Sequence, residues 1–166
     1  MGKVKIINST FELALRFLAI MRICTYPLSE YRLRAYSYLC IHLSDIEDSS
    51  TDIHPALPYR SSLFMATQEI LHPALHILLT KGLIDCVYEN AGIRYKITRV
   101  GCQYIDMIQG EYKQVLLEAI SNVDEIFQSF TDDYLRSEIT AKIEKWGSEF
   151  DNEYILVSED LVDDKN

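Results

Sequence analysis

Two stretches near the start of the chain, residues 11–23 and 31–43, carry apolar residues at helical spacing. Ser9 precedes the first stretch and Ser29 the second, where a serine hydroxyl can accept a hydrogen bond from a backbone N–H of the first turn. Pro27 lies between the two stretches, and proline cannot continue a helix. The pattern predicts two serine-capped helices with broad apolar faces.

A second pair of helices is predicted after a loop at residues 45–58, which is rich in charge, serine and proline. This loop is long for a connection in a compact domain, so it can carry function or dock against another surface. The serine pair at residues 61–62 can cap a helix that runs to about Leu71. Pro73 fits the first turn of another helix that runs to Lys81, because the first turn needs no N–H from that residue.

Residues 81–98, KGLIDCVYENAGIRYKIT, predict a helix stop followed by a hairpin. Gly82 stands where the end of a helix needs a left-handed residue, a conformation that glycine adopts without steric cost. β-branched and aromatic residues lie on both sides of Asn90 and Gly92, which favour a tight loop. We therefore expect two short antiparallel strands here.

Thr98 can cap a further helix that ends near Gly110. Helix, glycine stop, hairpin and helix is the order of elements in a winged-helix domain. We predict an α+β fold, mostly helical, with a two-stranded wing. Such a domain usually binds nucleic acid or a protein partner, and the fold alone does not decide between them.

Beyond Gly110, residues 112–130 and 133–146 have the spacing of two amphipathic helices. Nothing in the predicted domain covers their apolar stripe, so we expect a partner to dock there. The candidate docking residues are Leu116, Ile120, Ile126, Phe127, Phe130 and Trp146.

Residues 147–166 contain seven acidic residues and one lysine. They predict an acidic tail that is either flexible and solvated or bound by a partner, in which case 154–157 would add a strand to the partner's sheet. The chain thus divides into a winged-helix domain at residues 1–110, a C-terminal helical extension at 111–146 and the tail.

Charge is distributed unevenly along the 166 residues, whose formal net charge is −9. Residues 1–110 hold 11 basic and 10 acidic residues, whereas residues 111–166 hold 5 and 15. A dedicated DNA-binding protein is expected to carry a marked basic face, because neutralising phosphates supplies most of its nonspecific affinity. The totals show no such basic excess.

Five basic residues are nevertheless candidates for DNA contact, because they surround the predicted helices and the wing. Arg94 and Lys96 alternate with apolar residues, so they share the hairpin face opposite the apolar one. The alternative is an ordinary solvated face, since Glu69, Asp85 and Glu89 lie nearby. The candidates are Arg60, Lys81, Arg94, Lys96 and Arg99.

The chain contains no motif for catalysis or for a cofactor: it has no P-loop, no GxGxxG loop and no GxSxG turn. His72 and His76 are four residues apart, a spacing compatible with a metal, but no third ligand is nearby in the sequence. The four cysteines are isolated, which favours buried free thiols over disulfides or zinc. We predict that the protein is not an enzyme and needs no cofactor or metal.

Apolar runs along the chain are all far shorter than the roughly 20 residues that a membrane-spanning helix needs. The N-terminus also lacks the pattern of a secretory signal. We therefore expect a cytoplasmic protein.

The order of several sequence blocks resembles the small middle component of bacterial ABC-three-component systems, including the small subunit of Lamassu-type defence operons. The blocks are INSTFELALRFLAI, YRLRAYSYLCIH, DIHPALPYRSSL, EILHPALHILLTKGLID and GIRYKIT. The resemblance runs from about Ile7 to Val123. HPALPYRS at 54–61 and LLTKGLI at 78–84 carry most of it.

The resemblance implies a noncatalytic adaptor that joins an SMC-like or Rad50-like coiled-coil ATPase to an effector, often a nuclease, in defence against phages or plasmids. The alternative from the residues alone is a free-standing winged-helix transcription regulator. A helix between Ser61 and Lys81 would then enter the major groove, with the hairpin against the backbone.

Overall fold

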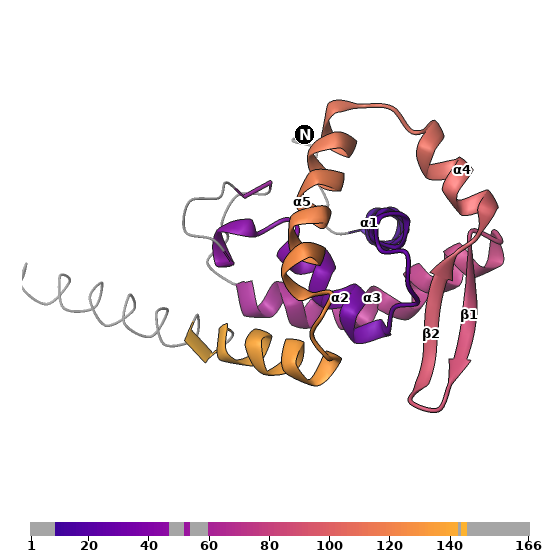
Figure 1. Ribbon diagram of the computed structural model, residues 1–166. Coiled ribbons are helices and arrows are strands. Elements are labelled where there is room, and N and C mark those ends of the chain that lie inside the picture. The colour runs from indigo at the N-terminus through magenta and orange to yellow at the C-terminus, as the bar shows by residue number, and fades with distance from the viewer. Residues whose placement is uncertain (1–8, 47–51, 54–59, 143, 146–166) are drawn as a thin grey trace, which may run out of the picture.

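The computed structural model describes residues 9–46, 52–53, 60–142 and 144–145 (Figure 1). Its elements are α1 (Thr10–Ile23), α2 (Glu30–Leu39), the 3-10 helix η1 (Leu43–Asp45), α3 (Arg60–Thr80), β1 (Ile84–Glu89), β2 (Gly92–Ile97), α4 (Arg99–Met107) and α5 (Glu111–Phe127). Residues 132–142 and 144–145 are also helical and are called the C-terminal segment below. The fold is mostly helical with one antiparallel hairpin, which confirms the predicted α+β class and its winged-helix-like arrangement.

Three of the four predicted helix caps are present; the prediction that the serine pair at residues 61–62 caps a helix was wrong, because both residues lie inside α3. Ser9 Oγ accepts a hydrogen bond from the N–H of Glu12 at 3.1 Å. Ser29 caps α2 in the same way through the N–H of Arg32 at 3.1 Å, and Thr98 caps α4 at 3.0 Å. Each hydroxyl satisfies a donor that the helix itself leaves free, so local sequence fixes where these helices begin.

The prediction of two helices between residues 61 and 81 was wrong, because α3 is one helix of 21 residues with Pro73 inside it. Phe64 in the first half and Leu71, Leu75 and Leu78 further along are all buried. Their spacing of seven, four and three places them on one helix face. Continuous burial against the core outweighs the hydrogen bond that Pro73 cannot make.

The wing pairs β1 with β2 from Ile84 opposite Ile97 to Glu89 opposite Gly92. The loop between the strands is therefore two residues long. Gly82 has a φ of +67°, so the predicted glycine stop of the preceding helix is confirmed.

A backbone bridge fastens the wing to the segment between α1 and α2. The N–H of Leu28 donates to the carbonyl of Tyr95 at 2.9 Å, and the N–H of Tyr95 donates back at 2.8 Å. Tyr95 is buried, and its hydroxyl donates to Glu30 at the start of α2. Strand β2 of the wing is thus part of the folded core.

Helix α1 lies at the centre of the fold, and Figure 1 looks along it. It packs against α2, α3, α4 and α5, and its buried residues include Phe17, Leu18 and Ile20. The buried face of α5 joins the same core through Ile120 and Val123. Residues on both sides of Gly110 therefore share one core, and the division of the chain at residue 110 stays an interpretation of the sequence.

Several predictions fall on residues outside those that the structure describes. These are the loop beyond residue 46 apart from 52–53, most of the HPALPYRS block, Trp146 and the acidic tail at 147–166. In the described part of the chain, none of the helices has the length and apolar character needed to cross a bilayer. All four cysteines are free thiols; two of them are buried and two half-buried.

Helix α4 approaches the base of the wing so closely that Gly101 has no room for a side chain. A Cβ at this position would lie 2.1 Å from the carbonyl oxygen of Leu83 and 2.7 Å from Cγ1 of Ile97. The first of these neighbours is backbone and cannot turn away.

Replacing Gly101 with alanine tests this close approach, because helix propensity and overpacking change the free energy of unfolding in opposite directions. Helix propensity favours alanine over glycine by about 1 kcal/mol, whereas overpacking costs about 1–3 kcal/mol. We expect Gly101→Ala to lower the free energy of unfolding measured in urea. The exposed control Gln103→Ala should leave it nearly unchanged. A more stable Gly101→Ala protein would contradict the close approach.

Candidate functional site

Arg94, a candidate for DNA contact, is bound to carboxylates of its own chain. Its Nε lies 2.8 Å from Oε2 of Glu89, and its Nη2 lies 3.9 Å from Oδ2 of Asp132. The first contact lies within the wing, and the second joins the wing to the C-terminal segment. A phosphate would have to compete with both carboxylates for this guanidinium.

Lys81 and Arg99 are exposed at the base of the wing. Thr98 Oγ1 donates to the carbonyl oxygen of Gly82 at 2.8 Å, which draws the two ends of the hairpin together. Lys81 precedes this bond and Arg99 follows it. The structure therefore brings the backbones of Lys81 and Arg99 near each other and leaves both side chains exposed to solvent.

The remaining basic candidates do not extend this pair into a basic face. Lys96 is exposed but lies opposite Asp85 in the strand register. Arg60 begins α3, and its side chain is outside the described residues. Between residues 61 and 80 the helix has no lysine or arginine, and it exposes Glu69. The helix that would enter a major groove thus carries no positive charge of its own along most of its length.

The two histidines with metal-like spacing contact different groups. Nδ1 of His72 lies 3.7 Å from Oε1 of Glu30, and Nδ1 of His76 lies 3.5 Å from Oγ1 of Thr80. Within the described parts of the chain, no group of three His, Cys, Asp or Glu residues gathers as a metal site would require.

The expectation of an apolar stripe exposed along the C-terminal helices was wrong for α5. Leu116, Ile120 and Phe127 are buried, because α1 and α2 cover that face. These three docking candidates are not at the surface. Ile126 and Phe130 are 38% and 40% exposed, so they stay available to a partner.

An exposed aromatic pair forms the corner between α5 and the C-terminal segment. Phe130 stacks on Tyr134 with ring centroids 4.4 Å apart, and it meets the buried Phe127 edge to face at 6.3 Å. Tyr134 is 44% exposed and was missed in the sequence. Tyr134 lies four residues after Phe130, and this helical spacing could have indicated in the sequence that the two rings are neighbours. We call Ile126, Phe130 and Tyr134 the aromatic corner.

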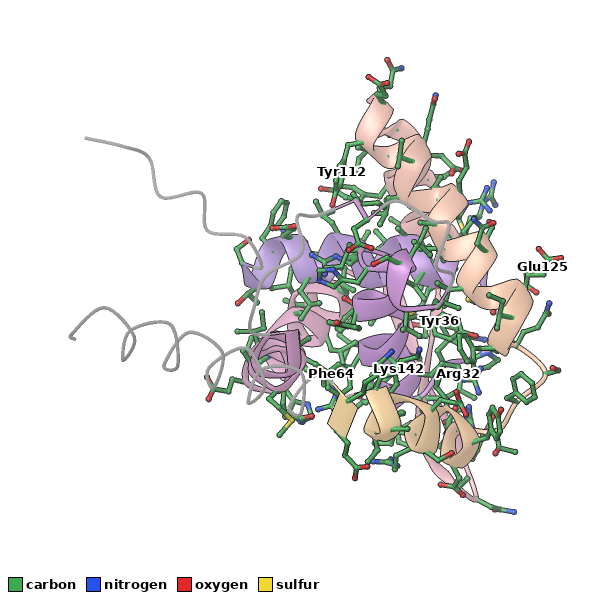
Figure 2. All side chains as sticks on the ribbon, turned by 90° about the vertical axis from the view of Figure 1, so that its left-hand side faces the viewer. Arg32, Tyr36, Phe64, Tyr112, Glu125 and Lys142 are labelled. Atoms are coloured by element: carbon green, nitrogen blue, oxygen red, sulfur yellow. The ribbon has the colours of Figure 1, made fainter. Side chains whose placement is uncertain are left out.

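Arg32 holds this corner in place from inside the protein (Figure 2). The residue is only 3% exposed. Its Nη1 donates to the carbonyl of Phe127 at 2.9 Å, and its Nη2 donates to the carbonyl of Phe130. Its Nε donates to Asp132 Oδ1 at 2.7 Å. One side chain of α2 therefore caps the end of α5 and pairs with the start of the C-terminal segment.

Hydroxyl groups extend this network to the middle of α5. Arg32 Nη1 also donates to the hydroxyl of Tyr36 at 3.1 Å, and that hydroxyl donates to Oδ1 of Asp124 at 3.1 Å. Tyr26 donates to the same carboxylate oxygen. Burial raises the pKa of Tyr36 to about 12, so its hydroxyl keeps its proton at neutral pH.

A family model described as ABC-three component (ABC-3C) system Middle Component 2 matches residues 6–149. The chain belongs to this family. The match covers most of the chain and extends past Val123, where the resemblance was expected to fade. Neither the curated proteins nor the solved structures gave a match.

Membership in the Middle Component 2 family makes this chain one part of a multi-subunit system. The family model also includes the described part of the C-terminal segment. The aromatic corner and the Arg32 network therefore lie within the region that the family model covers.

The ion pair of Arg32 with Asp132 predicts a pH-dependent stability. Burial alone would raise the pKa of Asp132, but hydrogen bonds from Ser29 and Arg32 and the charges of Arg32 and Arg94 hold it below its usual value. A carboxylate with a lowered pKa stabilises the fold above its unfolded pKa of roughly 3.9, and this contribution is lost as the pH falls further.

We expect Asp132→Asn to lower the free energy of unfolding by about 3 kcal/mol at pH 7, because it leaves the buried guanidinium of Arg32 without its half-buried carboxylate partner. The deficit relative to the wild type should shrink as the pH falls below about 4, because the carboxylate of the unfolded wild type then takes up a proton while the folded one still resists it. Urea unfolding at pH 7 and pH 3 measures both quantities. Asp133→Asn removes the same charge at an exposed position and serves as the control. A deficit that does not change with pH would contradict the role of the ion pair.

Proposed function

We propose that this middle component is a noncatalytic adaptor in a Lamassu-type defence complex. It would join an SMC-like or Rad50-like ATPase to a nuclease effector that acts against phages or plasmids. The family match over residues 6–149 carries the proposal, because a middle component acts within a multi-subunit system. The geometry supports an adaptor over an enzyme, since the surface of the described residues offers exposed aromatic and aliphatic groups and no gathering of three His, Cys, Asp or Glu side chains.

The aromatic corner is the proposed docking surface for the ATPase. Aromatic residues are enriched at protein interfaces, where they bury a large area for a small loss of conformational freedom. Phe130 and Tyr134 are stacked before any partner binds, so little further ordering is needed. The carbonyls of Phe127 and Phe130 are held by Arg32, which fixes the backbone that presents the rings.

The charges of the described surface favour a protein partner over a DNA-reading role. The exposed part of α3 lacks lysine and arginine between residues 61 and 80, and Arg94 is paired with Glu89 and Asp132. Lys81, Lys96 and Arg99 are the exposed candidates. Three cations provide much less counterion release than the six to ten phosphate contacts of many DNA-binding proteins.

Substitution of the aromatic corner tests docking. We expect the double variant Ile126→Ser, Phe130→Ser to bind the ATPase of the same system at least tenfold more weakly, because truncated interface anchors typically cost about 2 kcal/mol or more. Co-purification from cells that express both subunits, followed by calorimetric titration, measures the loss. Thermal unfolding checks that the variant is folded.

Two exposed apolar residues elsewhere provide matched controls for this experiment. Tyr88 near the tip of the wing is 80% exposed, and Met107 at the end of α4 is 79% exposed. Tyr88→Ser and Met107→Ser should leave ATPase binding within about twofold of the wild type. Equal binding by the corner variant and these controls would overturn the docking assignment.

A gel shift with the isolated chain distinguishes the adaptor from a transcription regulator. We expect no sequence-selective complex with duplex DNA at about 150 mM salt, since the phosphate-binding charge is small. The double variant Arg94→Gln, Lys96→Gln should still co-purify with the ATPase. Salt-sensitive, sequence-selective binding that this variant abolishes would favour the regulator instead.

A further inference from the structure

The two strands of the wing differ in how their edges are covered. Strand β2 is bonded on both sides, by β1 on one side and by Leu28 on the other. Figure 1 shows β2 toward the rest of the fold and β1 on the outer side of the hairpin. Among the residues that the structure describes, no backbone segment bonds the outer side of β1.

The backbone groups that point outward from β1 follow from the bonds of Tyr95. Its N–H and its carbonyl are both bonded to Leu28, so Tyr95 and its partner Cys86 are a pair without hydrogen bonds between them in the hairpin. The N–H and carbonyl of Cys86 therefore point away from β2. Because the direction alternates along a strand, those of Tyr88 do the same. This edge offers two donors and two acceptors to a further strand.

Strand β1 lacks most of the features that protect an edge from pairing. Proteins commonly protect such edges with proline, lysine, a bulge or a covering segment. The sequence of β1, IDCVYE, has neither proline nor lysine, and its register with β2 is continuous. Its two acidic residues face basic residues of its own hairpin: Asp85 lies opposite Lys96, and Glu89 is paired with Arg94 at 2.8 Å.

The same strand exposes a large aromatic side chain on the apolar face of the wing. Tyr88 is 80% exposed, whereas Ile84 on that face is buried and Cys86 is half-buried. Residues 81–98 hold three basic and two acidic residues, so the wing does not share the net negative charge of the chain. Two wings can therefore approach each other without strong repulsion.

We propose that β1 pairs with β1 of a second copy of this chain. The two strands run antiparallel and form one sheet in the order β2, β1, β1, β2. Such an interface is symmetric, because each copy offers the same edge to the other. The pairing supplies partners to the outward groups of Cys86 and Tyr88 in both copies. It uses neither the aromatic corner nor the adaptor role, and so it stands apart from the proposed function.

The charges of β1 select one register for this pairing. Two antiparallel registers pair five residues of each strand with the outward groups facing each other, one centred on Cys86 and one on Val87. The register centred on Val87 places Asp85 directly opposite Glu89 of the second copy, and like charges in that position are destabilising. The register centred on Cys86 places Asp85 opposite Val87 instead.

The register centred on Cys86 also covers the exposed aromatic ring. Side chains of the two apolar faces then lie on the same side of the combined sheet, with Tyr88 opposite Ile84 of the second copy. One short strand from each copy makes the contact, so the interface falls below the roughly 1,200 Å² of stable complexes. The dimer is therefore weak, and its population depends on the concentration of the chain.

Sedimentation equilibrium of the full chain from about 10 to 500 µM measures this association. The test variants are Val87→Glu and Val87→Lys, because residue 87 lies opposite Asp85 of the second copy. Two such pairs form in each dimer, so we expect glutamate to raise the dissociation constant about fivefold and lysine to lower it about fivefold. Met107→Ser, at an exposed apolar position of α4, should leave it unchanged.

The two variants also separate pairing from an effect on folding. Within its own hairpin, Val87 lies opposite Arg94. Glutamate at position 87 thus suits the hairpin and lysine disturbs it, so an effect that acts through folding alone would rank the two variants in the opposite order. Thermal unfolding of each variant provides this comparison.

Cross-linking tests the register. Cys86 lies opposite Cys86 of the second copy, at a Cα separation of about 5.5 Å, which a short bis-maleimide can span. The wild type and Cys102→Ser, which removes the other half-buried thiol, should yield the cross-linked dimer, whereas Cys86→Ser should not. A monomer at every concentration would overturn the proposal, as would a dimer that Val87→Glu does not weaken or that is cross-linked through Cys102.

Discussion

The guanidinium of Arg32 is the group on which the arrangement of the C-terminal half depends. Helix α5 ends near the surface, but the carbonyls of Phe127 and Phe130 face the buried guanidinium of Arg32, and the carbonyls of a helix end must find donors where water is excluded. Arg32 supplies two such donors and a third for Asp132. A buried arginine is expensive to desolvate, and this one is tolerated because each of its nitrogens has an acceptor. The direction in which the chain leaves α5 is set by one residue of α2.

The same constraint explains the distribution of apolar surface. Helix α5 packs its stripe onto α1 and α2, so residues of the same chain bury it. Among the apolar side chains that stay exposed are Phe130 and Tyr134, which lie just beyond the turn that Arg32 holds. A stripe buried within the described core, combined with stacked aromatic rings at its edge, suits a subunit that presents a preformed surface to a complex.

Local signals in the sequence were reliable where one residue decides the outcome. Ser9, Ser29 and Thr98 cap helices, and Gly82 ends one, as their chemistry requires. The sequence misled where tertiary packing overrules local preference: Pro73 indicated a helix start, but burial of residues on both sides keeps α3 continuous. Contacts between distant residues gave no signal, so the partners of Arg94 and the role of Arg32 could not be predicted. Burial of Leu116 and Ile120 likewise depends on where α5 returns to the core.

Asp132 connects two parts of the molecule that are far apart in the sequence. One of its oxygens is bound by Arg32 and the other lies near Arg94 of the wing. Strand β2 of the wing is also held by the two backbone hydrogen bonds between Leu28 and Tyr95. A partner that twists the wing would therefore strain the same carboxylate that anchors the C-terminal segment. If one partner binds the wing and another binds the segment, this shared carboxylate would couple the two events, and by linkage each would change the affinity for the other by the same factor.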